Sequence, residues 1–207
     1  MPLERQARAA CYADPVSRIA ERSQLSAAEY LVWEREQPVR HEFFRGEVFA
    51  MAGGSLRHNA LCLRLGSALH DVLRGQGCFE FSSDQRIGLD AGERYVYPDV
   101  SVVGGPVKLD AGTKDVITNP SVLVQVLSGS TEQYDRGLKW EAYQRLPSLT
   151  DYLLVSQAES RIEHFRREQG GSWTYRSYAS GERVVLTGGA ELDLDGICAG
   201  VFALAGD

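Results

Sequence analysis

The chain has 207 residues, of which 43% are hydrophobic and 24% charged, so it has the composition of one folded globular domain. Its net charge of −6 argues against a protein that coats DNA, because such proteins neutralise many phosphates with lysine and arginine. No stretch approaches the roughly 20 apolar residues that cross a bilayer, and the N-terminus lacks a secretion signal. We therefore expect a cytoplasmic protein without a membrane partner.

The N-terminal part of the chain divides into an extension and the start of a domain. Residues 1–22 show no sustained periodicity, and we expect them to be loosely ordered ahead of a single domain over 23–207. Ser26 and Glu29 have the S-x-x-E spacing of a capping box. This spacing predicts a short helix that runs through Trp33.

A strand region and a long helix come next. Aromatic and β-branched residues dominate 41–51, which predicts two strands that turn at Gly46 or one bent strand. From about Arg57 to Leu73, apolar residues recur at helical spacing and predict an amphipathic helix. The four cysteines show no paired spacing, so we expect no zinc knuckle, and we interpret Cys62 as a small buried hydrophobe.

The remainder of the chain predicts a β-rich core with one more helix. That helix is expected over 135–146, after a polar connection at 104–120. Strands are expected at 79–81, 86–89, 95–103, 122–127, 151–156, 161–167, 173–178, 182–187 and 191–197, with a hairpin at Gly170–Gly171. The order of elements predicts an α/β fold in which a mixed sheet is flanked by helices.

Asp99 is an acid within a strongly apolar run, directly after Pro98. A bare carboxylate is costly to bury, so Asp99 is either exposed at a bend or held by a specific partner. Pro98 cannot donate to a sheet ladder and predicts a strand edge or bulge. Two interpretations stay open for Asp99, an acid that receives a backbone hydrogen bond at the bulge and a metal ligand.

Gln125 and Lys139 extend the second interpretation. Gln125 interrupts the apolar run 122–127, and a polar side chain there must find hydrogen-bond partners. Lys139 lies on the predicted helix that follows, where a lone lysine is usually solvated. An acid on one strand, an acid on the next strand and a nearby lysine would form a metal-dependent phosphodiesterase site. Here the second acid is an amide.

The stretch from about Ser26 to Phe202 resembles the Uma-two family of restriction endonuclease-like proteins, within the PD-(D/E)XK phosphodiesterase superfamily. The strings that carry the resemblance are spread along the chain: Arg40-His41-Glu42, Gly46-Glu47, Met51-Ala52-Gly53, Arg57-His58, Tyr97-Pro98-Asp99-Val100-Ser101, Asn119-Pro120, Val126-Leu127-Ser128, Ser130-Thr131, Tyr134-Asp135-Arg136-Gly137, Lys139, Tyr143, Leu146-Pro147-Ser148-Leu149 and Tyr152-Leu153-Leu154-Val155. The resemblance implies a restriction-endonuclease-like core that hydrolyses DNA with Mg²⁺ or Mn²⁺.

The resemblance also implies roles for five residues. Asp99 corresponds to the first metal-binding acid, Gln125 to the second, and Lys139 to the catalytic lysine supplied by the following helix. Glu42 and His58 fall on further polar positions of the site. For His58 an alternative is an interaction with the first turn of its own helix.

This chain departs from the family pattern at two positions, with Gln125 in place of glutamate and Gly129 in place of the usual proline. Mg²⁺ prefers carboxylate, phosphate and water oxygens, so the uncharged amide of Gln125 should lower metal affinity and rate. Asp135, Glu132 or Glu42 would compensate if the fold brings one of them close. A glutamine that only holds the site together by hydrogen bonds fits the residues equally.

Three functions therefore remain open from the sequence. The first is a metal-dependent DNA hydrolase, and the second is a non-catalytic nuclease fold kept as a nucleic-acid-binding or regulatory module. The third is an unrelated α/β domain. We also expect a homodimer, because nucleases of this superfamily often pair to address two DNA strands.

Overall fold

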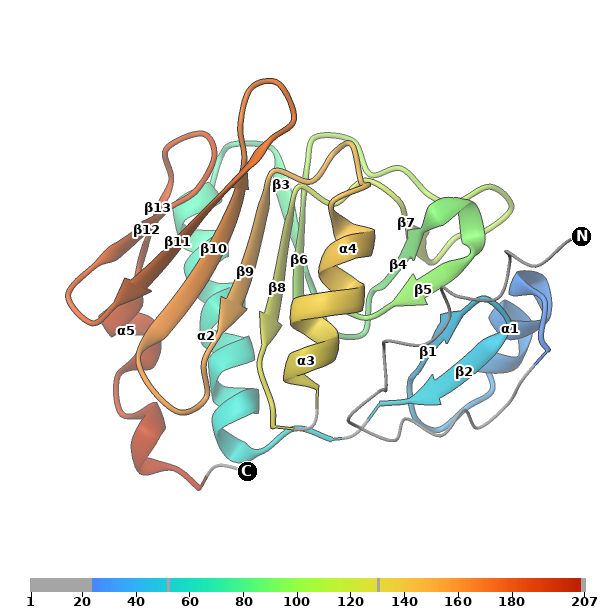
Figure 1. The fold of residues 1–207 in the computed structure, drawn as a ribbon, viewed down its shortest axis with the longest axis horizontal. Coiled ribbons are helices and arrows are strands. Elements are labelled where there is room, and N and C mark those ends of the chain that lie inside the picture. The colour runs from blue at the N-terminus through green and yellow to red at the C-terminus, as the bar shows by residue number, and fades with distance from the viewer. Residues whose placement is uncertain (1–23, 52, 130, 206–207) are drawn as a thin grey trace, which may run out of the picture.

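The computed structural model describes residues 24–51, 53–129 and 131–205 (Figure 1). The predicted N-terminal extension over 1–22 lies outside the described residues. In the part of the chain that is described, no helix has the length and apolar character needed to cross a membrane.

The described residues form two larger sheets, one small sheet and several helices, which confirms the predicted α/β fold. The helices are α1 (Ala27–Glu34), α2 (Leu56–Leu73), α3 (Glu132–Tyr134), a π-helical turn (Asp135–Lys139), α4 (Trp140–Tyr143), α5 (Leu194–Cys198) and 3₁₀ turns at Asp90–Gly92 and Val201–Ala203. The strands are β1 (His41–Phe44), β2 (Glu47–Ala50), β3 (Cys78–Ser82), β4 (Arg86–Leu89), β5 (Arg94–Val96), β6 (Val100–Gly104), β7 (Val116–Ile117), β8 (Val122–Val126), β9 (Asp151–Val155), β10 (Arg161–Arg167), β11 (Trp173–Ala179), β12 (Arg183–Val185) and β13 (Glu191–Asp193).

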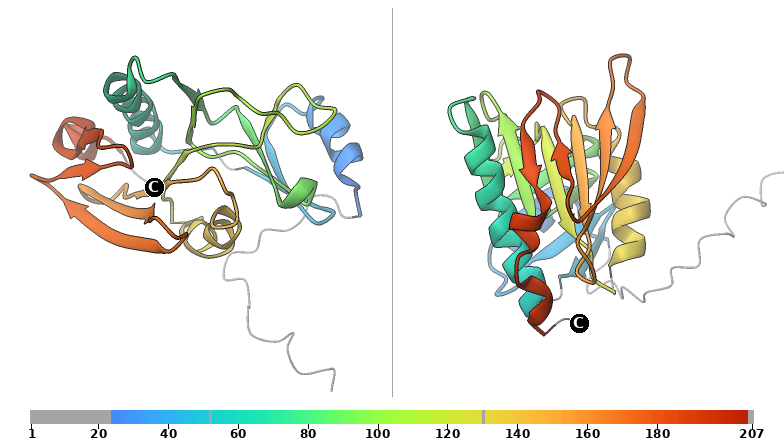
Figure 2. Two further views of the ribbon diagram at one scale, coloured as in Figure 1. Left: turned by 90° about the horizontal axis from the view of Figure 1, so that it is seen from above. Right: turned by 90° about the vertical axis from the view of Figure 1, so that its left-hand side faces the viewer.

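The central sheet has the strand order β11-β10-β9-β8-β6-β3 and lies between two helical layers. Figure 2 shows α2 on one face and the α3–α4 segment on the other. The alternation of β8 explains this packing, because successive side chains of a strand point to opposite faces. Val124 packs in the core that contains the leucines of α2, whereas Leu123 packs in the core that contains Tyr143 of α4. Gln125, two residues after Leu123, therefore belongs to the α4 side.

The chain changes sheets at Pro98 and Asp99. The sequence predicts one strand over 95–103, but the structure splits it into β5, in the sheet ordered β2-β1-β5-β4-β7, and β6, in the central sheet. Pro98 provides the physical reason, since it has no N–H to continue a ladder. Asp99 lies in the bend just before β6 and is thereby held at the junction of the two sheets.

Two local expectations are confirmed. Ser26 caps α1 through a complete capping box with Glu29. The alternatives for 41–51 resolve into the strand pair β1–β2. Arg45 and Gly46 have φ of 47° and 93°, and positive φ at both central residues is what a two-residue type I′ hairpin requires.

One strand expectation is wrong at the C-terminal end. The strand predicted over 191–197 ends at Asp193, and Leu194–Cys198 forms the short helix α5. Leu194, Ile197 and Cys198 are buried in the same core as the leucines of α2. Their helical spacing lets all three face that core, which a strand would not allow.

Candidate active site

Asp99 is held at the end of the β6–β8 ladder. Val100 pairs with Val124 in the last pair of this antiparallel ladder, and Asp99 lies in the bend directly before it, near the end of β8 that carries Gln125. The Val126 N–H donates a 2.7 Å hydrogen bond to Asp99 Oδ2, and His58 Nε2 lies 3.1 Å from Asp99 Oδ1. Asp99 thus receives the backbone hydrogen bond that one interpretation predicted, and its second oxygen contacts a residue that the resemblance implicates.

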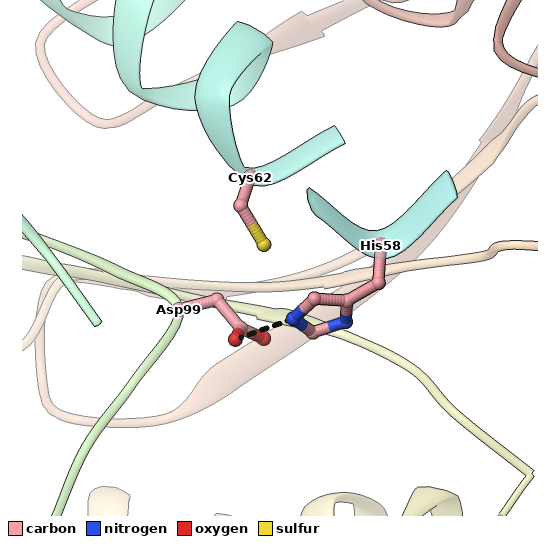
Figure 3. A group of neighbouring side chains, drawn as sticks. All are labelled: His58, Cys62 and Asp99. Atoms are coloured by element: carbon pink, nitrogen blue, oxygen red, sulfur yellow. Dashed lines mark ion pairs between the residues drawn. The ribbon is translucent and has the colours of Figure 1, made fainter. Parts of the chain in front are cut away.

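His58 and Cys62 reach Asp99 from the first turns of α2 (Figure 3). Ser55 caps this helix and accepts a hydrogen bond from the His58 N–H, so His58 also takes part in the first turn of its own helix. Cys62 lies one helical turn after His58, and the ligand atoms of His58, Cys62 and Asp99 all lie within 4.8 Å of one another. Burial, and secondarily the Asp99 carboxylate, raises the pKa of the Cys62 thiol.

Cys62 is a residue of this site that the sequence interpretation missed. Its apolar neighbours indicated a buried hydrophobe, and the side chain is in fact only partly buried beside Asp99. The signal that could have found it is the spacing of four from His58, because residues i and i+4 share one helix face.

Lys139 lies in the interior, which shows that the solvated interpretation of this residue is wrong. Its Nζ is 3.0 Å from Glu42 Oε1 and 3.0 Å from Asp135 Oδ1, and all three side chains are at most 5% exposed. Burial lowers the pKa of Lys139, but the two carboxylates outweigh it and hold the pKa well above its usual value. Burial also raises the pKa of Asp135, against the opposing effect of Lys139.

Two tyrosines connect this ion cluster to the central sheet. Gln125 Nε2 donates a 3.2 Å hydrogen bond to the hydroxyl of Tyr143 on α4. The hydroxyl of Tyr152 on β9 donates a 3.1 Å hydrogen bond to the backbone carbonyl of Asp135. Burial raises the pKa of Tyr152, and the nearby charges of Asp135 and Asp99 raise it further.

The five predicted site residues thus fall into two neighbouring groups. Asp99 and His58 meet on the side of α2, while Lys139 and Glu42 meet at the π-helical turn on the side of α4, next to Gln125. Of the acids that could compensate for Gln125, Glu42 and Asp135 are both engaged by Lys139. Glu132 instead pairs with Arg136 at 2.7 Å.

The donor chemistry around Asp99 allows two kinds of metal site. Asp99 and Gln125 bring a carboxylate and an amide to the same end of a ladder, and these oxygen donors fit a hard divalent cation such as Mg²⁺ or Mn²⁺. They carry one formal negative charge where the family pattern would carry two. On the other side, an imidazole nitrogen and a thiol sulfur lie beside the same carboxylate.

Residues 27–195 match the family described as "Putative restriction endonuclease" (Uma2). This chain is also similar to two proteins of Synechocystis sp. (strain ATCC 27184 / PCC 6803 / Kazusa), both named as uncharacterized. The first, slr1290, is 40% identical over 78% of this chain and 84% of its own length. The second, sll1609, is 37% identical over 72% and 84%.

A solved structure shares the fold. It is titled as a "putative nuclease" from Anabaena variabilis ATCC 29413 and superposes with a TM-score of 0.65. The match covers 86% of this chain and 99% of that chain at 15% sequence identity. At this identity the likeness concerns the fold, an arrangement of mixed sheets flanked by helices.

Proposed function

This chain belongs to the Uma2 family of restriction endonuclease-like proteins, and we propose that it is a metal-dependent endonuclease that hydrolyses DNA phosphodiester bonds at a rate reduced by Gln125. The observation that carries the proposal is the position of Asp99. Its carboxylate lies at the end of the β6–β8 ladder, where the N–H of Val126, the residue after Gln125 on the neighbouring strand, donates a hydrogen bond to it.

Asp99 and Gln125 are the residues that would hold the cation. When bound, a divalent cation would polarise the scissile phosphate and lower the pKa of an attacking water. Asp99 supplies the only formal charge of this pair, and the Val126 N–H fixes the direction of its carboxylate. Gln125 would supply a neutral amide oxygen, so the cation would be bound more weakly than by two carboxylates.

Lys139 and His58 support these ligands. We assign Lys139 to the stabilisation of charge that develops on the phosphate, as the resemblance implies, because its raised pKa keeps it an ammonium. Glu42 and Asp135 hold that ammonium in position. His58 acts as a positioning residue, since its Nε2 contacts the Asp99 oxygen that the backbone leaves available.

A non-catalytic nuclease fold that binds nucleic acid is the second candidate. One observation favours it, the hydrogen bond from Gln125 Nε2 to Tyr143. This bond gives the amide a structural task inside the core and satisfies part of its hydrogen-bonding capacity. In that case the fold would retain a surface for DNA without turnover.

Cleavage of supercoiled plasmid in Mg²⁺ or Mn²⁺ distinguishes the two candidates. We expect slow nicking by the native protein, none by Asp99→Ala, and nicking by Gln125→Glu that is faster by roughly tenfold or more, about 1.4 kcal/mol of barrier. Asp84→Ala is the matched control, because Asp84 is an exposed acid that pairs with Arg40.

The outcomes separate the candidates cleanly. Nicking that persists in Asp99→Ala contradicts the assigned site. Cleavage by Gln125→Glu alone identifies a nuclease fold silenced at one residue. Absence of cleavage by all variants, with DNA binding retained, supports the non-catalytic module.

A further inference from the structure

The cluster His58, Cys62 and Asp99 has a composition that the proposed nuclease chemistry does not require. We propose that these three residues bind one zinc-class transition-metal ion, with a coordination position left open to the groove beside α2. The site combines a nitrogen, a sulfur and an oxygen donor, all within 4.8 Å of one another, and is shown in Figure 3.

The donor set points to zinc or a similar ion rather than to magnesium. Thiolate and imidazole ligands suit Zn²⁺ and related transition metals, whereas Mg²⁺ takes oxygen ligands and retains its water. In a tetrahedral site with bonds of about 2.0–2.3 Å, the donors lie about 3.3–3.8 Å apart. The widest separation here, 4.8 Å at most, therefore needs to close by only about 1 Å, which is within reach of a side-chain adjustment.

The scaffold around the ligands is already ordered. His58 and Cys62 project from one face of an 18-residue helix, and Ser55 caps the turn that carries His58. Asp99 is oriented by the Val126 N–H, a hydrogen bond of the kind that typically fixes a carboxylate ligand. The 3.1 Å contact between His58 Nε2 and Asp99 Oδ1 already places two of the three ligand atoms side by side.

A groove gives access to the cluster. It has a volume of about 520 Å³, and Cys62 and Asp99 line it together with Gly66, Phe81 and Val100. His58 itself is partly accessible, with 19% of its side chain exposed. Three protein ligands with an exposed fourth position are the arrangement of a site that can take water or another small ligand.

The same helix carries a natural comparison. His70 lies 3.1 Å from Glu80, the same separation as that between His58 and Asp99. Among the residues that the structure describes, however, no thiol joins the His70 pair to form a second group of three metal ligands. The thiol of Cys62 is therefore the feature that sets the His58 pair apart.

One consequence rests on the proposed function. Asp99 is shared between the zinc-class site and the hard-cation site with Gln125, so occupancy of one removes a ligand from the other. Zinc should therefore inhibit plasmid cleavage in the native protein and inhibit Cys62→Ser less.

Titration of the reduced, metal-free full chain with Co²⁺ tests the binding directly, with no need for nuclease activity. We expect one equivalent to produce the charge-transfer absorption of a cobalt–thiolate bond, and Zn²⁺ to abolish it. Cys62→Ser should lose this absorption. His58→Gln should weaken binding by at least the roughly 10–100-fold that loss of an outer partner costs.

Matched controls are available for each ligand. Cys78→Ser, Cys11→Ser and His70→Gln should retain the absorption and the affinity of the native protein. Circular dichroism checks that each variant is folded. If Cys62→Ser does not fold, the affinity of His58→Gln for Co²⁺ tests the proposal in its place. Absence of the absorption in the native protein, its persistence in Cys62→Ser, or equal weakening by His70→Gln and His58→Gln would overturn the proposal.

Discussion

At the scale of single residues, Lys139 is a lysine buried in the interior, where lysines are rarely found. Its ammonium lies 3.0 Å from each of two buried carboxylates, Glu42 and Asp135. Removal of one partner from such a cluster leaves uncompensated charge in the interior. Lys139 therefore stabilises the fold where the π-helical turn meets β1, in addition to the role proposed for it in catalysis.

Lys139→Met tests this role in stability. Because the two acids would remain without their cation, we expect a loss of about 3–5 kcal/mol in the free energy of unfolding. Urea denaturation measures it at about pH 7. Lys108→Met is the control, since Lys108 is exposed, and it should change stability by less than about 0.5 kcal/mol.

The loss should depend on pH. Burial raises the pKa of Asp135 in the folded state and Lys139 opposes it, so the variant raises that pKa further. A carboxyl with a raised folded pKa holds its proton more tightly when folded. Its destabilisation of the folded state is therefore absent below the unfolded pKa of about 4 and grows as the pH rises toward the folded pKa. The deficit of the variant should therefore shrink from about pH 7 toward about pH 4, and a constant deficit would contradict this account.

At the scale of elements, the helix after β8 contains a π-helical turn at Asp135–Lys139. Such turns insert an extra residue into an α-helix and are frequent at functional sites. The sequence predicts a helix over 135–146, but the helical segment begins at Glu132 and ends at Tyr143. The irregular turn sets the direction in which Lys139 meets Glu42.

Deletion of Gly137 tests the importance of this turn. The deletion would convert the turn to α-helical geometry and shorten the spacing between Asp135 and Lys139 from four residues to three. Lys139 would then no longer contact Asp135 and Glu42 in the same geometry. We expect the deletion to lower the thermal midpoint and to abolish any nicking. Gly137→Ala is the control, because nothing lies within 4 Å of an added Cβ, and it should be neutral or stabilise by up to about 1 kcal/mol. Equal stability of the two variants would show that the π-helical turn is not needed.

At the largest scale, few arginines remain available for phosphate contacts in the part of the chain that the structure describes. The chain has 22 basic and 28 acidic residues. Several arginines are already paired with acids, as in Arg35–Asp115, Arg136–Glu163 and Arg145–Asp90. DNA binding by this chain should therefore involve a limited groove rather than an extended basic face.

The salt dependence of DNA affinity measures the number of phosphates contacted. We expect a plot of log K against log salt with a slope of magnitude below about 4, since each neutralised phosphate contributes about 0.9. Fluorescence anisotropy with a labelled duplex gives the slope. A steeper dependence would indicate a basic surface that the ion pairs do not suggest.

Sedimentation of the protein without DNA tests the predicted homodimer.

Local patterns in the sequence were enough to predict the class of fold, the family and most of the elements. Periodicity is a local property, so the capping box at Ser26, the leucines of α2 and the apolar run of β8 predict their own structures. The aspartate after Pro98 and the glutamine within β8 were likewise recognisable, because each is a polar residue in an apolar run. The C-terminal helix α5 was not, since five residues carry too little periodicity.

Which side chains meet could not be predicted from local patterns and follows from the packing of the fold. The pairing of Lys139 with Glu42 joins residues far apart in the sequence, and no local pattern encodes such a contact. The contact of Cys62 with Asp99 was likewise not predictable, because the apolar neighbours of Cys62 in the sequence indicate only that it is buried. Asp99 links the two cases, because the change of sheets at Pro98 brings its carboxylate to His58 on α2 and to the end of β8. Contacts of this kind depend on how sheets and helices pack, which is a property of the whole chain.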